Sequence, residues 1–121
     1  MIYTLAVATG GALGAVSRYW LISAMSGSRF PWGTFTVNVA GSVLIGVLYV
    51  LITEKAVLTE QWRAILVVGY LGAFTTFSTF SLDALLLLQE GRLLQAALYV
   101  LGSVVICLLG AWLGISLMRA L

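Results

Sequence analysis

Four long apolar segments, separated by short polar loops, account for nearly all of this chain. They run over about residues 2–25, 34–52, 62–88 and 93–118. A helix needs about 20 apolar residues to cross the hydrocarbon core of a bilayer. Four such helices use almost all of the 121 residues, so the sequence predicts an all-α membrane protein with a single four-helix transmembrane domain, 1–121. We expect a multi-pass protein of the cell (inner or plasma) membrane.

The composition excludes several classes of protein. Hydrophobic residues make up 62% of the chain and charged residues only 8%, whereas a soluble domain carries about 25% charged residues. There is no His, and the one Cys, Cys107, lies in an apolar run. Intramolecular disulfides and Cys/His zinc sites are therefore excluded, and Cys107 is expected to be a small packing residue. Without a carboxylate pair, or a nucleophile beside a base, we expect no enzyme. No polybasic run indicates nucleic acid.

The third segment carries a polar stretch at its middle. Residues 72–81 read Gly-Ala-Phe-Thr-Thr-Phe-Ser-Thr-Phe-Ser, with five hydroxyl side chains and three Phe at a spacing of three. A continuous helix over 62–88 would be about 40 Å long, which exceeds the roughly 30 Å core. Together with Gly69 and Gly72, this length predicts a break at the centre of the segment. Because irregular backbone persists in hydrocarbon only beside protein or a water-filled cavity, the stretch should face a pathway or a partner.

Polar side chains also recur at helical spacing in other segments. Thr34, Asn38 and Ser42 are four residues apart and so share one face of the second segment. A buried Asn amide is costly unless it is hydrogen-bonded. Asn38 is therefore expected either to make an interhelical hydrogen bond or to line a polar track as an N–H donor, and the sequence leaves both open. In the fourth segment the same spacing joins Tyr99, Ser103 and Cys107.

The basic residues do not select an orientation in the membrane. Arg18, about two-thirds along the first segment, either snorkels to the interface or lies at the mouth of an aqueous vestibule that attracts anions. The side of the termini holds three basic residues and the other side two or three, which leaves almost no bias for the positive-inside rule. Copies of opposite orientation could then pair about an axis in the membrane plane. The basic residues compared are Lys55, Arg63 and Arg119 against Arg29, Arg92 and, depending on its depth, Arg18.

The available chemistry favours a small anion. Hydroxyl and amide groups can donate to it, and an aromatic ring presents a positive edge. A small multidrug-resistance-type proton-coupled exporter is the alternative, but it requires a carboxylate within a span, and the first segment has none. The only acid near a span interior is Asp83. A non-transporting assembly subunit is a third interpretation.

Three stretches resemble the Fluc (CrcB) family of fluoride channels. They are residues 10–19, Gly-Gly-Ala-Leu-Gly-Ala-Val-Ser-Arg-Tyr; residues 33–42, Gly-Thr-Phe-Thr-Val-Asn-Val-Ala-Gly-Ser; and residues 69–81, which end in Phe-Thr-Thr-Phe-Ser-Thr-Phe-Ser. With the four-segment layout, the resemblance covers essentially the whole chain. The fourth segment is similar more loosely, through Tyr99 and Ser103, and Cys107 lies where a hydroxyl would extend their row.

The resemblance implies an antiparallel, dual-topology homodimer that lets fluoride leave the cytoplasm passively and lowers fluoride toxicity. It implies that the backbone carbonyls of Gly72 and Thr75 from both subunits hold a structural Na⁺ at the dimer interface, and that Arg18 lies in a vestibule. It also implies pores along the subunit interface, in which the ring edges of two Phe and the amide of the Asn would contact fluoride. The pathway residues are then Asn38, Phe77, Phe80, Thr34, Thr79, Ser81, Tyr99 and Ser103.

Overall fold

The computed structural model describes all residues, 1–121, and they form helices and short connections without any strand. In hydrocarbon a backbone must satisfy its own hydrogen bonds, and a helix does so within one segment. Two of the spans are single α-helices, and the other two include a π-helical stretch, labelled η. In chain order the elements are α1 (Ile2–Ala24), α2 (Trp32–Tyr49), η1 (Val50–Glu54), α3 (Glu60–Arg63), η2 (Ala64–Leu71), α4 (Gly72–Phe74), α5 (Phe77–Gln89) and α6 (Leu93–Ala120).

Four stretches of helix are long and apolar enough to cross a membrane. They are Ile2–Ala24, Trp32–Glu54, Glu60–Gln89 and Leu93–Ala120. The expected class, an all-α multi-pass membrane protein, is confirmed. Each observed helix begins and ends within two residues of the segment expected from the sequence, and most of these ends lie outside the expected segment. The reason is that the apolar pattern marks only the part of a helix that lies in hydrocarbon, whereas helical hydrogen bonding continues into the polar flanks.

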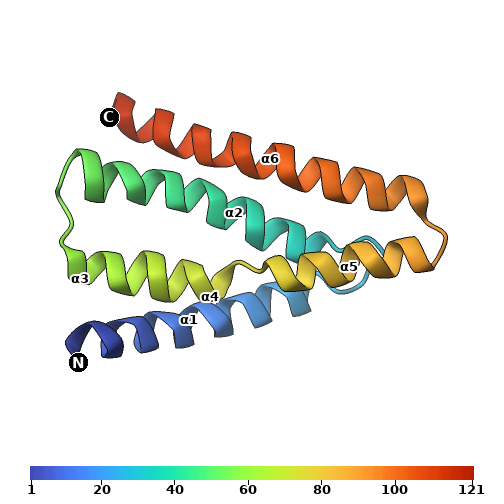
Figure 1. Ribbon diagram of the computed structural model, residues 1–121, viewed down its shortest axis with the longest axis horizontal. Helices are drawn as coiled ribbons and strands as arrows, with labels where there is room; N and C mark the ends of the chain where they lie inside the picture. The colour runs from blue at the N-terminus through green and yellow to red at the C-terminus, as the bar shows by residue number, and fades with distance from the viewer.

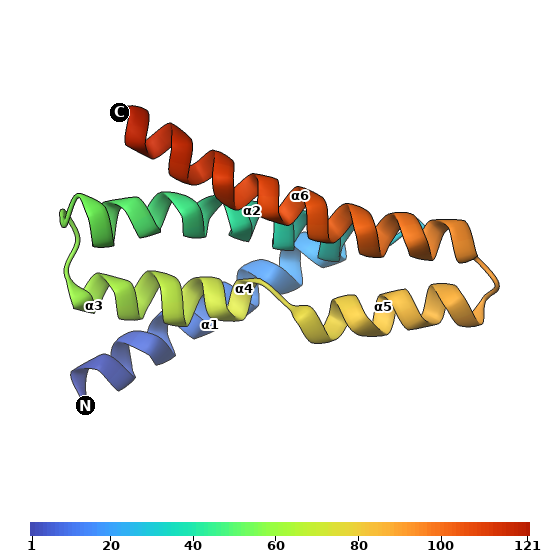
Figure 2. The same ribbon diagram turned by 45° about the horizontal axis from the view of Figure 1, so that its top comes forward.

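The helices pack in two close pairs. The ribbon shows α6 running beside α2, and α1 running beside the stretch from α3 to α4, with both termini at one end of the molecule (Figure 1). After a turn of view, α1 and α6 cross the other helices obliquely (Figure 2). Glycines permit these close approaches: a Cβ on Gly14 would collide with the carbonyl of Tyr70, and a Cβ on Gly114 would collide with the carbonyl of Val43. Such small-residue contacts are typical of helix packing in lipid.

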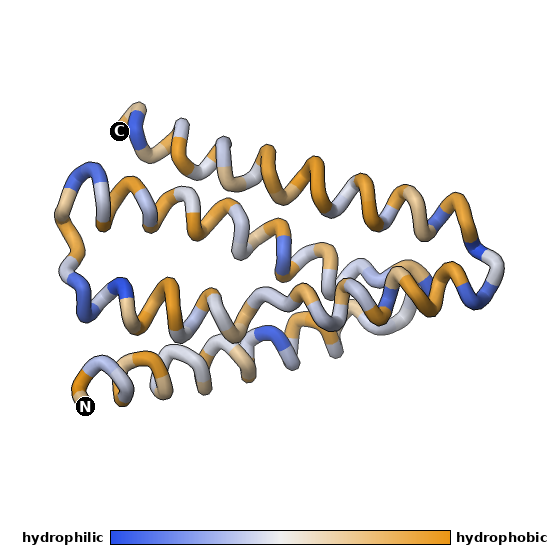
Figure 3. The backbone as a smooth tube through the Cα atoms, viewed as in Figure 1, coloured by the Kyte–Doolittle hydropathy of each residue, from blue (hydrophilic) through white to orange (hydrophobic).

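Much of the outer surface is apolar. In Figure 3 the helix bodies are largely orange, and the blue, hydrophilic stretches gather mainly at the connections. On α6, Leu101, Leu108 and Trp112 are 66%, 67% and 64% exposed. A soluble monomer rarely exposes apolar side chains on this scale, so this surface belongs in contact with lipid or with another copy of the chain.

The third span is broken where the sequence predicts it. Thr75 (φ −88°, ψ 159°) and Thr76 (φ −153°, ψ 117°) are extended and separate α4 from α5, and the ribbon narrows to a thread between the two helices (Figure 1). The Thr76 hydroxyl caps α5 by accepting a hydrogen bond from the Thr79 N–H at 3.2 Å. A Cβ on Gly41 of α2 would collide with the Thr75 methyl group, so the absence of a side chain there lets the break approach α2.

Candidate functional site

Asn38 of α2 holds the backbone of the broken helix. Its Nδ2 donates to the Thr76 carbonyl at 3.0 Å, and the Thr76 N–H donates to its Oδ1 at 2.8 Å. Since each atom of the amide can play only one of these roles, the pair fixes the orientation of the amide. The interhelical hydrogen bond considered from the sequence is therefore formed. It uses one of the two Nδ2 hydrogens, so one N–H remains for another acceptor.

The same contacts leave two backbone carbonyls without the hydrogen bond that each would accept in a continuous helix. In an unbroken helix the Gly72 carbonyl would accept from the Thr76 N–H, and the Thr75 carbonyl from the Thr79 N–H. Here the Thr76 N–H donates to Asn38, and the Thr79 N–H donates to the Thr76 hydroxyl. Neither carbonyl receives its helical hydrogen bond. These are the two oxygens to which the sequence analysis assigns Na⁺, and neutral carbonyl oxygens are suitable ligands for a hard monovalent cation.

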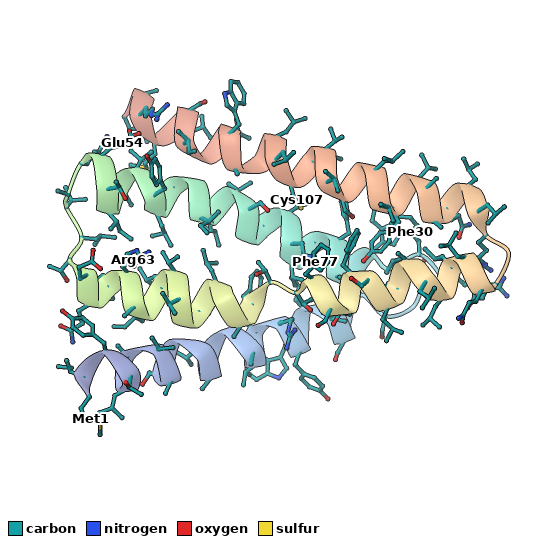
Figure 4. All side chains as sticks on the ribbon, viewed as in Figure 1. Met1, Phe30, Glu54, Arg63, Phe77 and Cys107 are labelled. Atoms are coloured by element: carbon teal, nitrogen blue, oxygen red, sulfur yellow. The ribbon has the colours of Figure 1, made fainter.

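An open groove of about 360 Å³ lies beside the break. Its walls come from α2, from the segment around the break and from α6, and they contain no ionisable side chain apart from one thiol. Figure 4 shows two of the wall residues, Phe77 on α5 and Cys107 on α6, in the region between these helices. The residues that can interact with a ligand through a polar atom or a ring are Asn38, Ser42, Thr75, Thr76, Phe77, Phe80, Ser103 and Cys107.

Ser103 is the one wall residue with an unsatisfied buried group. The residue is 6% exposed, and its hydroxyl oxygen is buried without a hydrogen-bond partner. Leaving such a group unpaired costs roughly 1–3 kcal/mol. This hydroxyl oxygen exposes less than 1 Å², so it can donate to a ligand in the groove only after its side chain rotates.

A row of aromatic rings leads away from the groove. Phe77 lies 5.5 Å from Phe80 between ring centroids, and Phe80 lies 5.1 Å from Tyr99. Tyr99 then meets Phe30 edge to face at 5.5 Å and 85°. Tyr99 is fully buried and its hydroxyl donates to the Asp83 carboxylate at 3.2 Å, whereas Phe77 is 78% exposed. The row therefore runs from an open ring at the groove to a closed aromatic cluster beside the loop before α2.

The predicted pathway residues fall into two groups. The structure brings Asn38, Phe77, Phe80 and Ser103 together as walls of the groove. The remaining four, Thr34, Thr79, Ser81 and Tyr99, do not line it, and neither does Arg18, which was predicted to lie in a vestibule. The roles of all these residues, wall residues included, stay predictions. Thr34 is buried in α2, Thr79 bonds the Thr76 hydroxyl at 3.1 Å, Ser81 bonds the Phe77 carbonyl at 3.0 Å, Tyr99 stands behind Phe80, and Arg18 is half-buried on α1.

The structure also adds residues to this region. Cys107 was expected to be a packing residue, but it lines the groove, because the spacing of four that joins it to Ser103 also places it on the groove face. Two further residues were not singled out by the sequence analysis. Thr76 is hydrogen-bonded to Asn38 and caps α5, and Phe30 contacts Tyr99. The hydroxyl run contains Thr76, but Phe30 lies in a loop without periodicity and has no comparable signal.

Comparison with known proteins assigns the family. A family model described as "CrcB-like protein, Camphor Resistance (CrcB)" matches residues 5–115. A protein of Hahella chejuensis named "Fluoride-specific ion channel FluC" is 50% identical over 116 residues, which covers 93% of this chain and 91% of that protein. Proteins with the same name from Magnetococcus marinus and Geobacter sulfurreducens are 48% and 44% identical, and cover 93% and 100% of this chain and 94% and 100% of their own lengths. The chain therefore belongs to the CrcB family.

Proposed function

We propose that this protein is a fluoride-specific ion channel, not an enzyme, and that it lets fluoride leave the cytoplasm passively. The observation that carries the proposal is the groove at the broken third span, whose walls offer neutral hydrogen-bond donors and ring edges without a fixed charge. Relatives covering nearly the whole chain carry the name of such a channel. Nothing favours the multidrug-exporter alternative, because α1 holds no acid and these relatives are named as channels.

The groove suits a small, strongly hydrated anion. A dry path must replace the water around fluoride with directed donors. Asn38 has one unused N–H, and the Ser103 hydroxyl has no partner. Phe77 and Phe80 can present positive ring edges in succession. Because all of these groups are neutral, they bind the ion weakly enough for it to leave again, and a narrow passage excludes larger halides.

The channel requires a second copy of the chain. The groove is open on one side, and Phe77 at its wall is 78% exposed. An antiparallel homodimer of dual topology closes the groove into a pore, and the nearly unbiased Lys and Arg distribution supports both orientations. Lipid and the partner copy then share the exposed apolar surface.

Sodium is a structural part of this proposal. The carbonyls of Gly72 and Thr75 lack their helical hydrogen bonds, and Gly72 is exposed. The corresponding carbonyls of both copies would hold Na⁺ at the dimer interface, where the ion supplies positive charge that neutralises the carbonyl dipoles of two broken helices. The residues of this chain supply the oxygens and keep the break open.

The test replaces one ring at the groove and one ring away from it. Phe80→Ile keeps an apolar side chain but removes the positive ring edge, and we expect fluoride flux to fall by roughly tenfold or more. Phe35→Ile is the matched control, because Phe35 lies on α2 and does not line the groove. Fluoride efflux from liposomes is measured, and dimer recovery is checked by size-exclusion chromatography. If both variants form dimers and conduct like the unmodified protein, the groove is not the fluoride pathway.

A further inference from the structure

A second, strongly polar pocket lies at the end of the molecule opposite both termini. It contains about 490 Å³, is open on one side, and is lined by Arg29, Glu90 and Arg92. Arg29 comes from the loop before α2, and the other two come from the turn between α5 and α6, at the far end of the ribbon from the N- and C-termini (Figure 1). No basic run in the sequence indicates this pocket, because its two arginines belong to different connections.

Aromatic packing and a glycine turn bring these two connections together. Phe30, next to Arg29 in the chain, meets Tyr99 of α6 edge to face at 5.5 Å. Phe30 also packs against the apolar cluster between α5 and α6. Gly91 has a φ of +76°, which a residue with a side chain rarely adopts, and it lets the chain turn back from α5 into α6. The fold itself therefore places both arginines at one pocket.

The pocket has an excess of positive charge, since it holds two guanidinium groups and one carboxylate. Glu90 pairs with Arg92, with 3.3 Å between its Oε2 atom and the Arg92 Nε atom, and Arg92 Nη1 donates to Gln95 at 3.1 Å. A guanidinium has five N–H donors, so Arg92 keeps some that these contacts do not use. Arg29 has no salt-bridge partner. Two guanidinium groups with free donors match the oxygens of a phosphate group.

Apolar side chains beside the pocket indicate which kind of phosphate it meets. Leu93 and Leu94 follow Arg92 directly, are 65% and 73% exposed, and begin the fourth membrane-spanning helix. Trp32 is 47% exposed and lies 4.5 Å from Phe30 between ring centroids, and tryptophan is enriched where membrane meets water. The pocket therefore lies at the level of the lipid headgroups. The 13 residues of α5, about 20 Å of helix, separate it from the break and the groove that the partner copy is proposed to close.

We propose that this pocket binds the phosphate group of an anionic phospholipid, held between Arg29 and Arg92, with the acyl chains of the lipid along Leu93 and Leu94. Basic pockets at the membrane surface attract anionic headgroups. Free phosphate shares the chemistry of the headgroup but has no acyl chains to cover the exposed leucines. A zwitterionic phospholipid carries its own cation, so the positive pocket attracts it less. Glu90 weakens the binding, because its carboxylate offsets one of the two positive charges.

The experiment measures the binding of dioleoyl phosphatidylglycerol to the purified protein in detergent micelles by native mass spectrometry, with dioleoyl phosphatidylcholine as the zwitterionic comparison. We expect one phosphatidylglycerol bound per chain and weaker binding of phosphatidylcholine. Arg29→Gln should lower the affinity for phosphatidylglycerol by roughly fivefold, and Glu90→Gln should raise it by a similar factor. The matched control is Arg63→Gln, which removes one positive charge at the opposite end of the molecule (Figure 4) and should leave the affinity unchanged.

Four results would each overturn the proposed lipid site. They are equal affinity for the two phospholipids, unchanged affinity in Arg29→Gln, an equal loss of affinity in Arg63→Gln, and displacement of the lipid by excess inorganic phosphate, which would mean that the pocket takes free phosphate instead. Arg29 is exposed and has no salt-bridge partner, so its replacement should leave the unfolding temperature unchanged. Because binding is measured without fluoride, the result does not depend on whether the protein conducts fluoride.

Discussion

Replacing Asn38 by alanine should destabilise the protein by disrupting the break in the third span. Asn38 donates to the Thr76 carbonyl at 3.0 Å and accepts from the Thr76 N–H at 2.8 Å, so a single side chain satisfies both backbone groups of Thr76. Thr76 is 7% exposed, which leaves little access for water. Alanine keeps α2 helical, since it is the best helix former, so the change acts on the contact rather than on the helix.

The expected loss follows from the two unpaired groups. Each buried backbone group left without a partner costs roughly 1–3 kcal/mol, so Asn38→Ala should lower the free energy of unfolding by about 2–6 kcal/mol. If the Thr76 N–H instead returns to the Gly72 carbonyl, only the Thr76 carbonyl loses its partner, and the loss falls to roughly 1–3 kcal/mol. The matched control is Ser42→Ala. It removes only the bond from the Ser42 hydroxyl to the Asn38 carbonyl one turn earlier in the same helix, which should cost about 1 kcal/mol or less.

Two measurements check this prediction. Unfolding of both variants in detergent micelles gives the difference in free energy. Amide hydrogen exchange of a peptide covering residues 72–81 reports whether the backbone at the break has lost its partners. Exchange should change in Asn38→Ala and stay unchanged in Ser42→Ala. Equal stability of the two variants, with unchanged exchange over 72–81, would refute the reasoning that Asn38 maintains the break.

Three further predictions address packing, orientation and sodium. Gly14→Ala should lower the free energy of unfolding by roughly 1–3 kcal/mol, because the new Cβ would collide with a backbone carbonyl. The control Gly102→Ala should not lower it, because a Cβ there would have nothing within 4 Å. A Gly14→Ala variant more stable than the unmodified protein would contradict the packing. Reporter fusions at the C-terminus should give signal on both sides of the membrane. Lysines added to the 53–60 loop should force one orientation and reduce fluoride flux. A single orientation of the unmodified protein would exclude dual topology. Prolonged removal of Na⁺ should slowly lower fluoride flux and dimer recovery. If neither the flux nor the dimer recovery changes without Na⁺, the result would argue against the carbonyl site.

The arrangement of the spans could be predicted from the sequence because its cause is local. Apolar length determines how many helices cross the membrane, and a glycine- and hydroxyl-rich stretch in an overlong segment predicts a break. The partner that holds the break could not be predicted. Asn38 and Thr76 are 38 residues apart along the chain, and the sequence left open whether the Asn38 amide bonds a helix or lines a pathway.

Contacts between distant segments also explain what the sequence analysis missed at the site. Cys107 was expected to be a packing residue because its neighbours in the chain are apolar, although its spacing of four had placed it in one row with Tyr99 and Ser103. The positions of α2 and the break make the face that carries Ser103 and Cys107 the wall of a groove. Phe30 contacts Tyr99 through the path of a loop, which no periodicity describes. The π-helical stretch η2 (Ala64–Leu71) likewise has no signal in the sequence.

Fluoride efflux from liposomes containing the purified protein, with chloride as the control ion, tests the central claim most directly. The groove offers neutral donors and ring edges. If a second copy closes it into a narrow pore, as proposed, fluoride is lost rapidly and chloride is retained, because a narrow pore admits only the small anion. Chloride leaving at a comparable rate would contradict the selectivity argued from the groove. Fluoride leaving no faster than from protein-free liposomes would contradict the channel itself.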